Sequence, residues 1–370
     1  KCRIIMSIDN RLWSTKAKNL SPYVPGEQPK HDNLVKLNTN ENPYPPSPKA
    51  VMAMQAVLSN EACALRLYPE PESDELRQTL ADYHGLGLDE VFVGNGSDEV
   101  LALVFACFFM KQRPLLMPDI SYSFYPVYAD TFGVTTQSIP LKDDFSIDIK
   151  EYHQSCDGII LANPNAPTGR LLPIEDIKKL IAMHPDAVVV IDEAYIDYAD
   201  DVKQASAVRL IRQFDNLVIT QTFSKSRALA GLRVGMAFAN PNLIAALMAM
   251  KNSFNSYPLD RLAQAGAKAS VEDVAYFEDK RTQVIKLRKA LTQDLQTLGF
   301  TVLPSAANFV FATLPNHQAA DLSQALRQEG VIVRHFNQPR IKDYLRISVG
   351  TQAQNQRLID VLTQILAKMD

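Results

Sequence analysis

Uniformly apolar runs recur through the middle of the chain and predict strands that are buried on both faces. They lie at residues 115–117, 159–162, 188–192, 217–222 and 234–239. A strand with one face in water alternates apolar and polar side chains, whereas a strand covered on both faces does not. Helical patterns lie between several of these runs, at 173–183 and 202–213. This order predicts an α/β fold, with a mainly parallel sheet covered by helices on both faces.

The two ends of the chain differ from this central part. The first 48 residues are rich in proline and asparagine, which predicts an extended arm rather than a domain. Beyond about residue 255, a long helical stretch at 272–298 precedes a smaller α+β segment. Its pattern predicts strands at 300–303, 308–311, 331–334 and 344–349 and helices at 319–328 and 351–367. We therefore expect an arm at 1–48, a large domain at 49–255 and a small domain at 256–370.

Composition and charge exclude several classes of protein. The chain has 370 residues, is 46% hydrophobic and 21% charged, and carries a net charge of −3 without long runs of one sign, so nucleic-acid binding is not expected. No apolar stretch reaches the ~18 residues of a membrane-spanning helix. The four cysteines are widely spaced, which predicts neither disulfides nor a metal site and favours the reducing cytoplasm. We expect a globular protein that binds neither membrane nor metal.

Lys225 is the most informative residue. It follows the apolar run 217–222, stands beside Ser224, and precedes Arg233 by eight residues. An amine at the carboxyl end of a buried strand, beside a hydroxyl and a fixed cation, suits Schiff-base chemistry on a phosphorylated aldehyde. Lys225 would attack the carbonyl, and Ser224 and Arg233 would hold the phosphate.

Asp192 and Tyr195 form a second group at a strand end. A carboxylate that ends an all-apolar strand requires a cationic partner, because burial of an unpaired charge costs several kcal/mol. A protonated pyridine nitrogen is such a partner, and Tyr195 could bond the phenolic oxygen of the same ring. The alternative is that Asp192 caps a turn and Tyr195 is packing. The 33 residues from Asp192 to Lys225 suffice for one strand–helix–strand crossover, so both would face one ligand.

Two glycine- or proline-containing turns also follow predicted strands. The turn at 94–96 leads into a helix at 97–110, with Ser97 as its expected N-cap and Asp98 in its first turn. Such a helix start can bind a phosphate, although an ordinary capped helix has the same pattern. The turn at 163–169 contains asparagines that could bond a ligand oxygen or only the turn backbone. A dinucleotide site is not favoured, because no Gly-x-Gly-x-x-Gly follows the first strand.

Together these residues resemble the cofactor site of fold-type I pyridoxal-phosphate enzymes, the class I and II aminotransferases. More narrowly, nearly the whole chain resembles the histidinol-phosphate aminotransferase family. The resemblance implies a seven-stranded large domain, a smaller α+β domain, and an arm that packs with the small domain and a partner subunit. It rests on Ser21-Pro-Tyr23, Leu37-Asn-Thr-Asn-Glu-Asn42, Arg66-Leu-Tyr68-Pro, Gly96-Ser-Asp-Glu99, Tyr122-Ser-Phe-Tyr125 and Leu345-Arg346-Ile-Ser-Val-Gly-Thr351.

The resemblance implies a role for each matching residue around pyridoxal 5′-phosphate. Lys225 would bind the cofactor covalently and shuttle a proton, Asp192 would hold the ring nitrogen, Tyr195 the phenolic oxygen, and Tyr122 would stack on the ring. The phosphate would be held by the backbone at Ser97 and Asp98, together with Ser224 and Arg233.

The resemblance also implies substrate contacts and a homodimer. Arg346 would clamp the α-carboxylate of the amino donor, a bidentate task that suits arginine. Tyr23 and Arg334 would recognise the phosphate of histidinol phosphate, and Asn42 would line the substrate site. Tyr68 would reach the cofactor of the partner subunit. The reaction would convert histidinol phosphate and 2-oxoglutarate to imidazole acetol phosphate and glutamate, a step of histidine biosynthesis.

One position departs from the family pattern. The family has asparagine immediately before Pro-Thr-Gly, bonding the phenolic oxygen of the cofactor, whereas this chain has Ala166 there and Asn165 one residue earlier. Either Asn165 makes the contact after a small shift, or Tyr195 acts without it. We favour Asn165.

Several other functions remain open at this stage. An aromatic amino-acid aminotransferase and a threonine-phosphate decarboxylase share this scaffold and differ in side-chain recognition or in the bond that is broken. A cofactor-sensing transcription regulator would need a DNA-binding extension, and the arm is too short and proline-rich to supply one. A plain metabolite-binding protein would not explain the lysine and the aspartate together.

Overall fold

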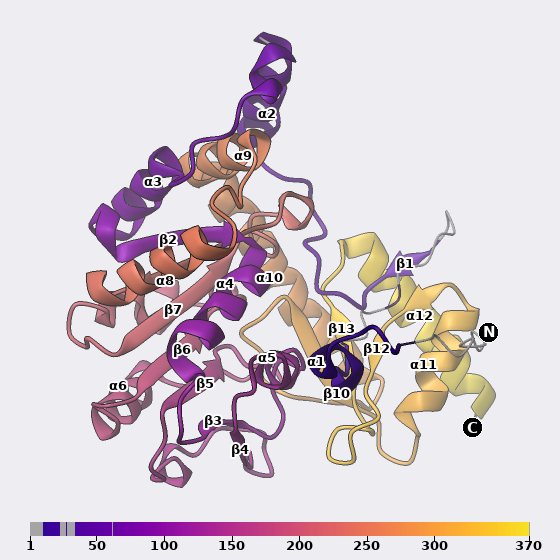
Figure 1. The fold of residues 1–370 in the computed structure, drawn as a ribbon. Coiled ribbons are helices and arrows are strands. Elements are labelled where there is room, and N and C mark those ends of the chain that lie inside the picture. Colours follow the sequence, from indigo (N-terminus) through magenta and orange to yellow (C-terminus); the bar gives the residue numbers. More distant parts are fainter. Residues whose placement is uncertain (1–9, 23–26, 28–33, 61, 370) are drawn as a thin grey trace.

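The computed structural model describes residues 10–22, 27, 34–60 and 62–369. Figure 1 shows a large sheet flanked by helices, with a smaller group of strands and helices beside it. The α-helices are α1 (Thr15–Asn19), α2 (Pro48–Asn60), α3 (Asp74–His84), α4 (Gly96–Val104), α5 (Tyr125–Phe132), α6 (Ile174–Met183), α7 (Val202–Ala205), α8 (Pro241–Phe254), α9 (Arg261–Glu272), α10 (Val274–Thr297), α11 (Ala319–Gln328) and α12 (Gln352–Met369). The strands are β1 (Val35–Lys36), β2 (Val91–Asn95), β3 (Leu115–Pro118), β4 (Thr136–Ile139), β5 (Gly158–Ala162), β6 (Val188–Asp192), β7 (Leu217–Thr222), β8 (Val234–Ala239), β9 (Thr301–Val302), β10 (Phe309–Thr313), β11 (Val331–Ile332), β12 (Arg334–His335) and β13 (Leu345–Ser348).

The large sheet has seven strands in the order β2-β8-β7-β6-β5-β3-β4. Strands β3 to β7 pair in parallel, and only β8 runs antiparallel to its two neighbours. The mainly parallel sheet predicted from the apolar runs is therefore confirmed. The edge strand β4 was not predicted, because most of its residues are polar and exposed rather than apolar.

Apolar side chains cover both faces of this sheet. On one face, alternate residues of β5 to β7 pack with α3, α6 and α9 in one cluster. On the other face, the intervening residues pack with α4, α5 and α8. Two covered faces explain why β5, β6 up to Ile191 and β7 up to Ile219 carry no polar side chain.

A second, four-stranded sheet has the order β12-β13-β10-β9 and packs with α10, α11 and α12 around its own core. The arm joins this unit, since β1 pairs in parallel with β11. Helix α9 lies beyond residue 255 but packs against α2 and α3, next to the large sheet. The division at 48 and 255 stays a prediction. No helix in the described part of the chain is long and apolar enough to span a bilayer.

Three predicted helices differ from the structure, each because a local contact intervenes. Ser97 is not an N-cap: Asn95 takes that position, and α4 begins at Gly96, whose φ of +76° is left-handed. The stretch 202–213 breaks at Ser206, whose hydroxyl donates to the buried Glu193 at 2.7 Å. The stretch 272–298 divides at Asp273, which accepts a hydrogen bond from Ser47 at 2.5 Å.

Candidate active site

The predicted cofactor residues meet at one edge of the large sheet. Strands β5, β6 and β7 are parallel, so their carboxyl ends share this edge, where Asp192 ends β6 and Lys225 follows β7. Because β8 is antiparallel to β7, its first residues lie at the same edge, and Arg233 precedes it. The turn after β2 reaches the edge as well, with Asn95 opposite Val234.

These residues line a common cavity of about 230 Å³. Its walls include Asp192, Lys225, Tyr195, Tyr122 and Arg233, together with Ser97, Asp98, Thr222, Ser224 and Ala166. A second cavity of about 240 Å³ shares Thr39, Tyr122, Ala166, Tyr195 and Lys225 with the first and extends to Arg334 and Arg346. The site therefore has two ends. We name them after the ligands predicted for them: the cofactor end, at the edge of the large sheet, and the substrate end, beside Arg334 and Arg346 of the small sheet.

Asp192 is a buried carboxylate at the cofactor end, only 5% exposed. Its oxygens accept hydrogen bonds from Tyr125 at 2.8 Å and Thr220 at 3.2 Å. Burial raises the pKa of the Asp192 carboxyl to about 6, because water no longer stabilises its charge. These partners are neutral, so an added cation in the cavity would be stabilised by this carboxylate.

Lys225 and Tyr195 face each other across the cavity. The Lys225 amine lies 5.7 Å from the centroid of the Tyr195 ring and donates to the carbonyl of Thr39 at 3.3 Å. Tyr195 packs edge-on against Phe309 of the small sheet, with ring centroids 5.1 Å apart. The amine is half-buried and points into the space that Asp192 also borders.

The start of α4 and Arg233 form the far wall of the cofactor end. A Cβ on Gly96 would lie 2.5 Å from the Arg233 guanidinium, and the φ of +76° at this position favours glycine as well. A Cβ on Gly235 would lie 2.3 Å from the backbone nitrogen of Ser97. The helix N-terminus and an arginine thus converge here, which suits a phosphate.

Asp98 and Tyr122 complete this wall. Arg233 pairs with Asp98 at 3.0 Å, and the Tyr122 hydroxyl donates to the other oxygen of Asp98 at 3.1 Å. Asp98 therefore presents its carboxylate to Arg233 and Tyr122, in addition to the backbone contact predicted for it. Burial raises the pKa of the Tyr122 hydroxyl well above its ordinary value, which keeps it a neutral donor.

Two arginines lie side by side at the substrate end. Arg334 of β12 and Arg346 of β13 are directly paired in the antiparallel register, and both line the second cavity. Each guanidinium carbon lies 5.5 Å from the centroid of the Phe336 ring. Like charges directly opposite each other repel, and an anion bound between them would relieve this repulsion. The pair is therefore suited to bind anions.

The structure does not support a cofactor contact for Asn165. Its side chain accepts a hydrogen bond from Ser121 at 3.0 Å and donates to Ile120 and Thr168. These bonds hold the asparagine inside its turn, and it is Ala166 that lines both cavities. The expected replacement of the family asparagine by Asn165 is therefore wrong.

Asn42 is likewise turned away from the predicted substrate site. Its amide donates to the backbone carbonyls of Lys225 and Ser226, each at 3.1 Å, and its oxygen accepts from the Tyr44 backbone. Asn42 lines neither cavity. It fixes the backbone that carries Lys225, so its predicted contact with substrate does not fit the structure.

The remaining two predicted residues lie elsewhere. Tyr68 is 76% exposed and stacks on Tyr257, with ring centroids 4.7 Å apart. Tyr68 does not line the cavities of its own chain. Tyr23 lies outside the described residues.

The sequence did not reveal the residues that form hydrogen bonds to Asp192 and Tyr195. Thr220 pairs in register with Asp192, and a polar residue within an apolar strand was the available signal. Tyr125, fully buried, belongs to a motif that was noted only for Tyr122. Asn40, which donates to the Tyr195 hydroxyl at 3.0 Å, was part of a recognised motif but received no role.

Sequence comparison with known proteins shows the family of this chain. Residues 32–362 match the model of the aminotransferase class I and II family. The chain is 63% identical over 368 residues to histidinol-phosphate aminotransferase 2 of Psychrobacter arcticus, covering 98% of each protein. The chain belongs to the aminotransferase class I and II family, as the sheet-edge site and the lysine motif predicted.

Solved structures agree with this fold. One described as a putative histidinol-phosphate aminotransferase of Erwinia carotovora atroseptica superposes with a TM-score of 0.84 at 28% identity, over 91% of this chain and 97% of that one. Another, histidinol-phosphate aminotransferase of Sinorhizobium meliloti in complex with pyridoxal-5′-phosphate, has a TM-score of 0.81 at 22% identity, over 90% and 91%. The predicted fold class, an α/β fold-type I transferase, is confirmed.

Proposed function

We propose that this aminotransferase uses pyridoxal 5′-phosphate to move an amino group between histidinol phosphate and 2-oxoglutarate. The observation that carries the proposal is that Asp192 and Lys225 line one cavity. A buried carboxylate with neutral hydrogen-bond partners borders the same cavity as a half-buried amine at the ends of adjacent strands. A ligand with a protonated ring nitrogen and an aldehyde would satisfy both groups.

The donor set of the cofactor end fits this group. Lys225 would hold the aldehyde carbon, Asp192 the ring nitrogen and Tyr195 the phenolic oxygen. The phosphate would be bound by Arg233, Ser224 and the α4 start at Ser97 and Asp98, where Gly96 and Gly235 leave the backbone open. The Asp98 carboxylate would orient Arg233 and Tyr122 rather than contact the phosphate itself.

Bound pyridoxal phosphate supplies an electron sink that stabilises negative charge at the substrate carbon bearing the amino group. Asp192 would hold the ring nitrogen, and its carboxylate would favour the protonated state of that nitrogen. The Lys225 amine would take the proton from the substrate carbon as a general base and deliver it to the former aldehyde carbon of the cofactor as a general acid. Tyr122 and Ala166 close the sides of the cavity and limit access of water.

The substrate assignment rests on the substrate end and on the relatives. Arg334 and Arg346 form a doubly cationic wall that suits the phosphate of one substrate and the carboxylates of the other. We assign Arg346 mainly to the α-carboxylate of glutamate and Arg334 to the phosphate of histidinol phosphate. Tyr23, outside the described residues, stays a predicted contact of the same phosphate. The name of the Psychrobacter relative, at 63% identity, favours the same substrate.

A steady-state assay tests this proposal. Purified protein with pyridoxal phosphate is given histidinol phosphate, phenylalanine or threonine phosphate, with 2-oxoglutarate as acceptor, and kcat/KM is measured. We expect histidinol phosphate to far exceed the others. Phenylalanine used equally well would indicate an aromatic aminotransferase, and carbon dioxide released from threonine phosphate would indicate a decarboxylase; either result contradicts the assignment.

We also propose that the enzyme is a homodimer with shared sites, in the cytoplasm. Helix α2 projects from the large sheet (Figure 1). Exposed apolar side chains lie on α2 and on the segment that follows it: Met52, Leu58, Leu65 and Leu67. Such a surface suits a second copy of the chain. Tyr68 follows Leu67 in this surface and would reach the site of the partner subunit.

Complementation between inactive subunits tests the shared site. Tyr68→Phe and Lys225→Ala proteins are mixed, dissociated and reassociated, and amino transfer is measured. If Tyr68 serves the partner's site, the mixed dimer contains one site with both residues intact, and part of the activity returns. Two controls matter: each variant alone must be severely impaired, and mixing without dissociation should restore nothing. No recovery in verified heterodimers would show that each site is built from one chain.

A further inference from the structure

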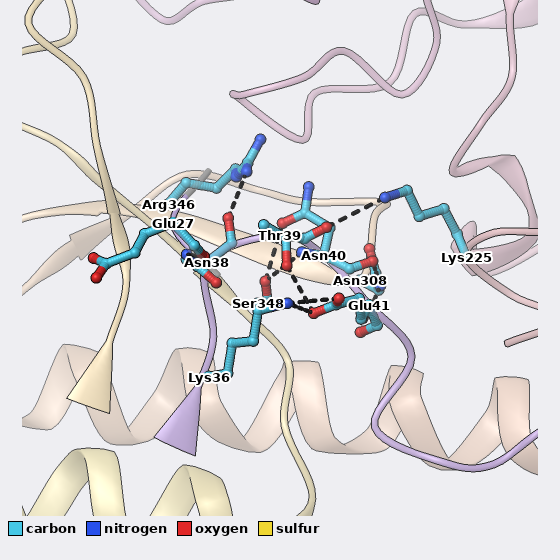
Figure 2. Close-up of polar contacts among 10 residues, drawn as sticks. All are labelled: Glu27, Lys36, Asn38, Thr39, Asn40, Glu41, Lys225, Asn308, Arg346 and Ser348. Atoms are coloured by element: carbon cyan, nitrogen blue, oxygen red, sulfur yellow. Dashed lines mark hydrogen bonds and ion pairs between the residues drawn. The ribbon is translucent and has the colours of Figure 1, made fainter. Parts of the chain in front are cut away.

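Residues 38–41 of the arm touch three predicted site residues in succession. The carbonyl of Asn38 accepts from Arg346 at 2.9 Å, the carbonyl of Thr39 accepts from Lys225 at 3.3 Å, and the Asn40 amide donates to Tyr195 at 3.0 Å. Figure 2 shows Arg346 and Lys225 approaching this segment from opposite sides. The segment therefore lies at the junction of the substrate and cofactor ends.

Asn40 is the most constrained residue of this segment. It is 1% exposed, and its φ of +58° lies in the left-handed region that asparagine tolerates better than most residues. Its backbone nitrogen donates to the Ser348 hydroxyl at 2.8 Å, and its carbonyl accepts from Asn308 at 2.9 Å. Two residues of the small sheet region thus fix the Asn40 backbone (Figure 2).

The same contacts set the direction of the Asn40 side chain. The Ser348 hydroxyl accepts from the Asn40 backbone nitrogen, and it donates its proton to Asn40 Oδ1 at 3.1 Å. Asn40 Nδ2 is therefore left to donate to the Tyr195 oxygen. Because that oxygen accepts from Asn40, the hydroxyl proton of Tyr195 is free to be donated into the cavity that Tyr195 lines.

The direction of the Tyr195 hydroxyl proton is important because the neighbouring position is Ala166. The methyl group of Ala166 lines the same cavity where the family pattern places an amide donor, and Asn165 is bonded within its turn. Of the two donors that the family resemblance assigns to the phenolic oxygen, Tyr195 then remains. A hydroxyl that accepts from an amide is polarised and becomes a stronger donor.

We propose that Asn40 is a positioning residue, whose amide holds the Tyr195 hydroxyl as a hydrogen-bond donor toward the phenolic oxygen of the cofactor. This inference rests on the proposed function in requiring a pyridoxal cofactor on Lys225. A hydrogen bond to the phenolic oxygen competes with the proton on the lysine–cofactor nitrogen for that oxygen. Asn40 therefore lowers the pH at which this nitrogen loses its proton.

Visible absorbance of the reconstituted protein against pH measures this midpoint directly. Asn40→Gly keeps the left-handed backbone and removes the amide, so the midpoint should rise, by about one pH unit if one hydrogen bond is weakened. Asn40→Asp keeps the size but replaces the donor with an acceptor, which would draw the Tyr195 proton away from the cofactor. Its midpoint should rise further than that of Asn40→Gly.

Two controls separate this role from a structural one. Asn38→Asp adds a carboxylate to the same segment. The Asn38 amide donates to the backbone carbonyl of Glu27 rather than to Tyr195, so the midpoint of this variant should rise less than that of Asn40→Asp. In a Tyr195→Phe background, Asn40→Gly should cause no further rise, because the hydroxyl through which it acts is absent.

The outcomes distinguish this inference from the proposed function. Asn40→Gly and Asn40→Asp proteins that bind cofactor with the midpoint of the unsubstituted protein would overturn the inference alone. A rise caused by Asn40→Gly that persists undiminished in the Tyr195→Phe background would overturn it as well. Unsubstituted protein that forms no visible band with pyridoxal phosphate would overturn the proposed function and this inference together.

Discussion

The two ends of the cavity are built in different ways. At the cofactor end, Asp192 and Lys225 sit at the ends of adjacent parallel strands, and Arg233 precedes the next strand of the same sheet. At the substrate end, Arg346 and Arg334 come from a separate sheet, and the arm segment 38–41, about 300 residues earlier in sequence, contacts Arg346. The cofactor end is thus set by one buried sheet, whereas the substrate end depends on long-range packing of three chain segments. Under the proposed function, the cofactor end would carry the chemistry and the substrate end would set the choice of substrate.

The largest expected effect comes from Lys225, which belongs to both ends. Lys225→Ala should still bind pyridoxal phosphate through Asp192, Arg233 and the start of α4, but lose turnover by roughly 10²–10⁴-fold or more, since the proton shuttle has no substitute. Cofactor binding is measured by absorbance and turnover with histidinol phosphate. Lys178→Ala, a surface lysine paired with Glu175 on α6, is the matched control and should remain active. Near-normal turnover by Lys225→Ala would show that Lys225 is not the catalytic lysine.

A substitution at Arg334 should affect the substrate end alone. Histidinol phosphate should exceed unphosphorylated histidinol in kcat/KM by on the order of a hundredfold, since charge-assisted hydrogen bonds contribute about 1.5–3 kcal/mol each. Arg334→Ala should erase much of this ratio and impair glutamate less, because Arg346 remains. Arg357→Ala, an exposed arginine of α12, is the control. A ratio near one in the unsubstituted enzyme would end the idea of phosphate recognition.

A smaller effect is expected on the stability of the cofactor-free protein. The pKa of the Asp192 carboxyl rises from 3.8 to about 6 on folding, so its stabilising contribution is complete below pH 3.8 and lost as pH rises through 6. At pH 8 the buried charge destabilises the protein by on the order of 3 kcal/mol. Asp192→Asn should therefore be more stable there without cofactor, by about 1 kcal/mol, because asparagine also replaces an acceptor with a donor.

Denaturant unfolding at pH 5 and pH 8 checks this prediction. The advantage of Asp192→Asn should be larger at pH 8, and pyridoxal phosphate should stabilise the unsubstituted protein but far less the variant. The same substitution should lower amino transfer strongly, since a neutral amide does not keep the ring nitrogen protonated. A variant with unchanged turnover would make Asp192 a structural residue only.

The sequence predicted the cofactor end well for a physical reason. Strands buried on both faces have an unmistakable apolar pattern, and parallel strands place their carboxyl ends at one edge. The order of the apolar runs was therefore enough to place Asp192 and Lys225 together. The same patterning located most elements of the small domain, including α11 at its observed bounds.

Predictions failed where side-chain hydrogen bonds, rather than burial, decide the conformation. Asn165 and Asn42 are bonded to nearby or distant backbone instead of facing the cavity, and the pattern contains no information on that choice. The break at Ser206 follows from its bond to Glu193, thirteen residues away. The backbone of Asn40 is held by hydrogen bonds to Ser348 and Asn308, near the other end of the chain. Contacts of this kind depend on the assembled fold.

The most direct test of the central claim is covalent trapping at the cofactor end. Protein reconstituted with pyridoxal phosphate is reduced with borohydride and digested, and the modified peptide is identified by mass spectrometry. We expect one modified residue, Lys225, because among the lysines that the structure describes only this one lines the cavity that Asp192 and Arg233 border. Modification of another lysine, or no stable adduct after reconstitution, would contradict it.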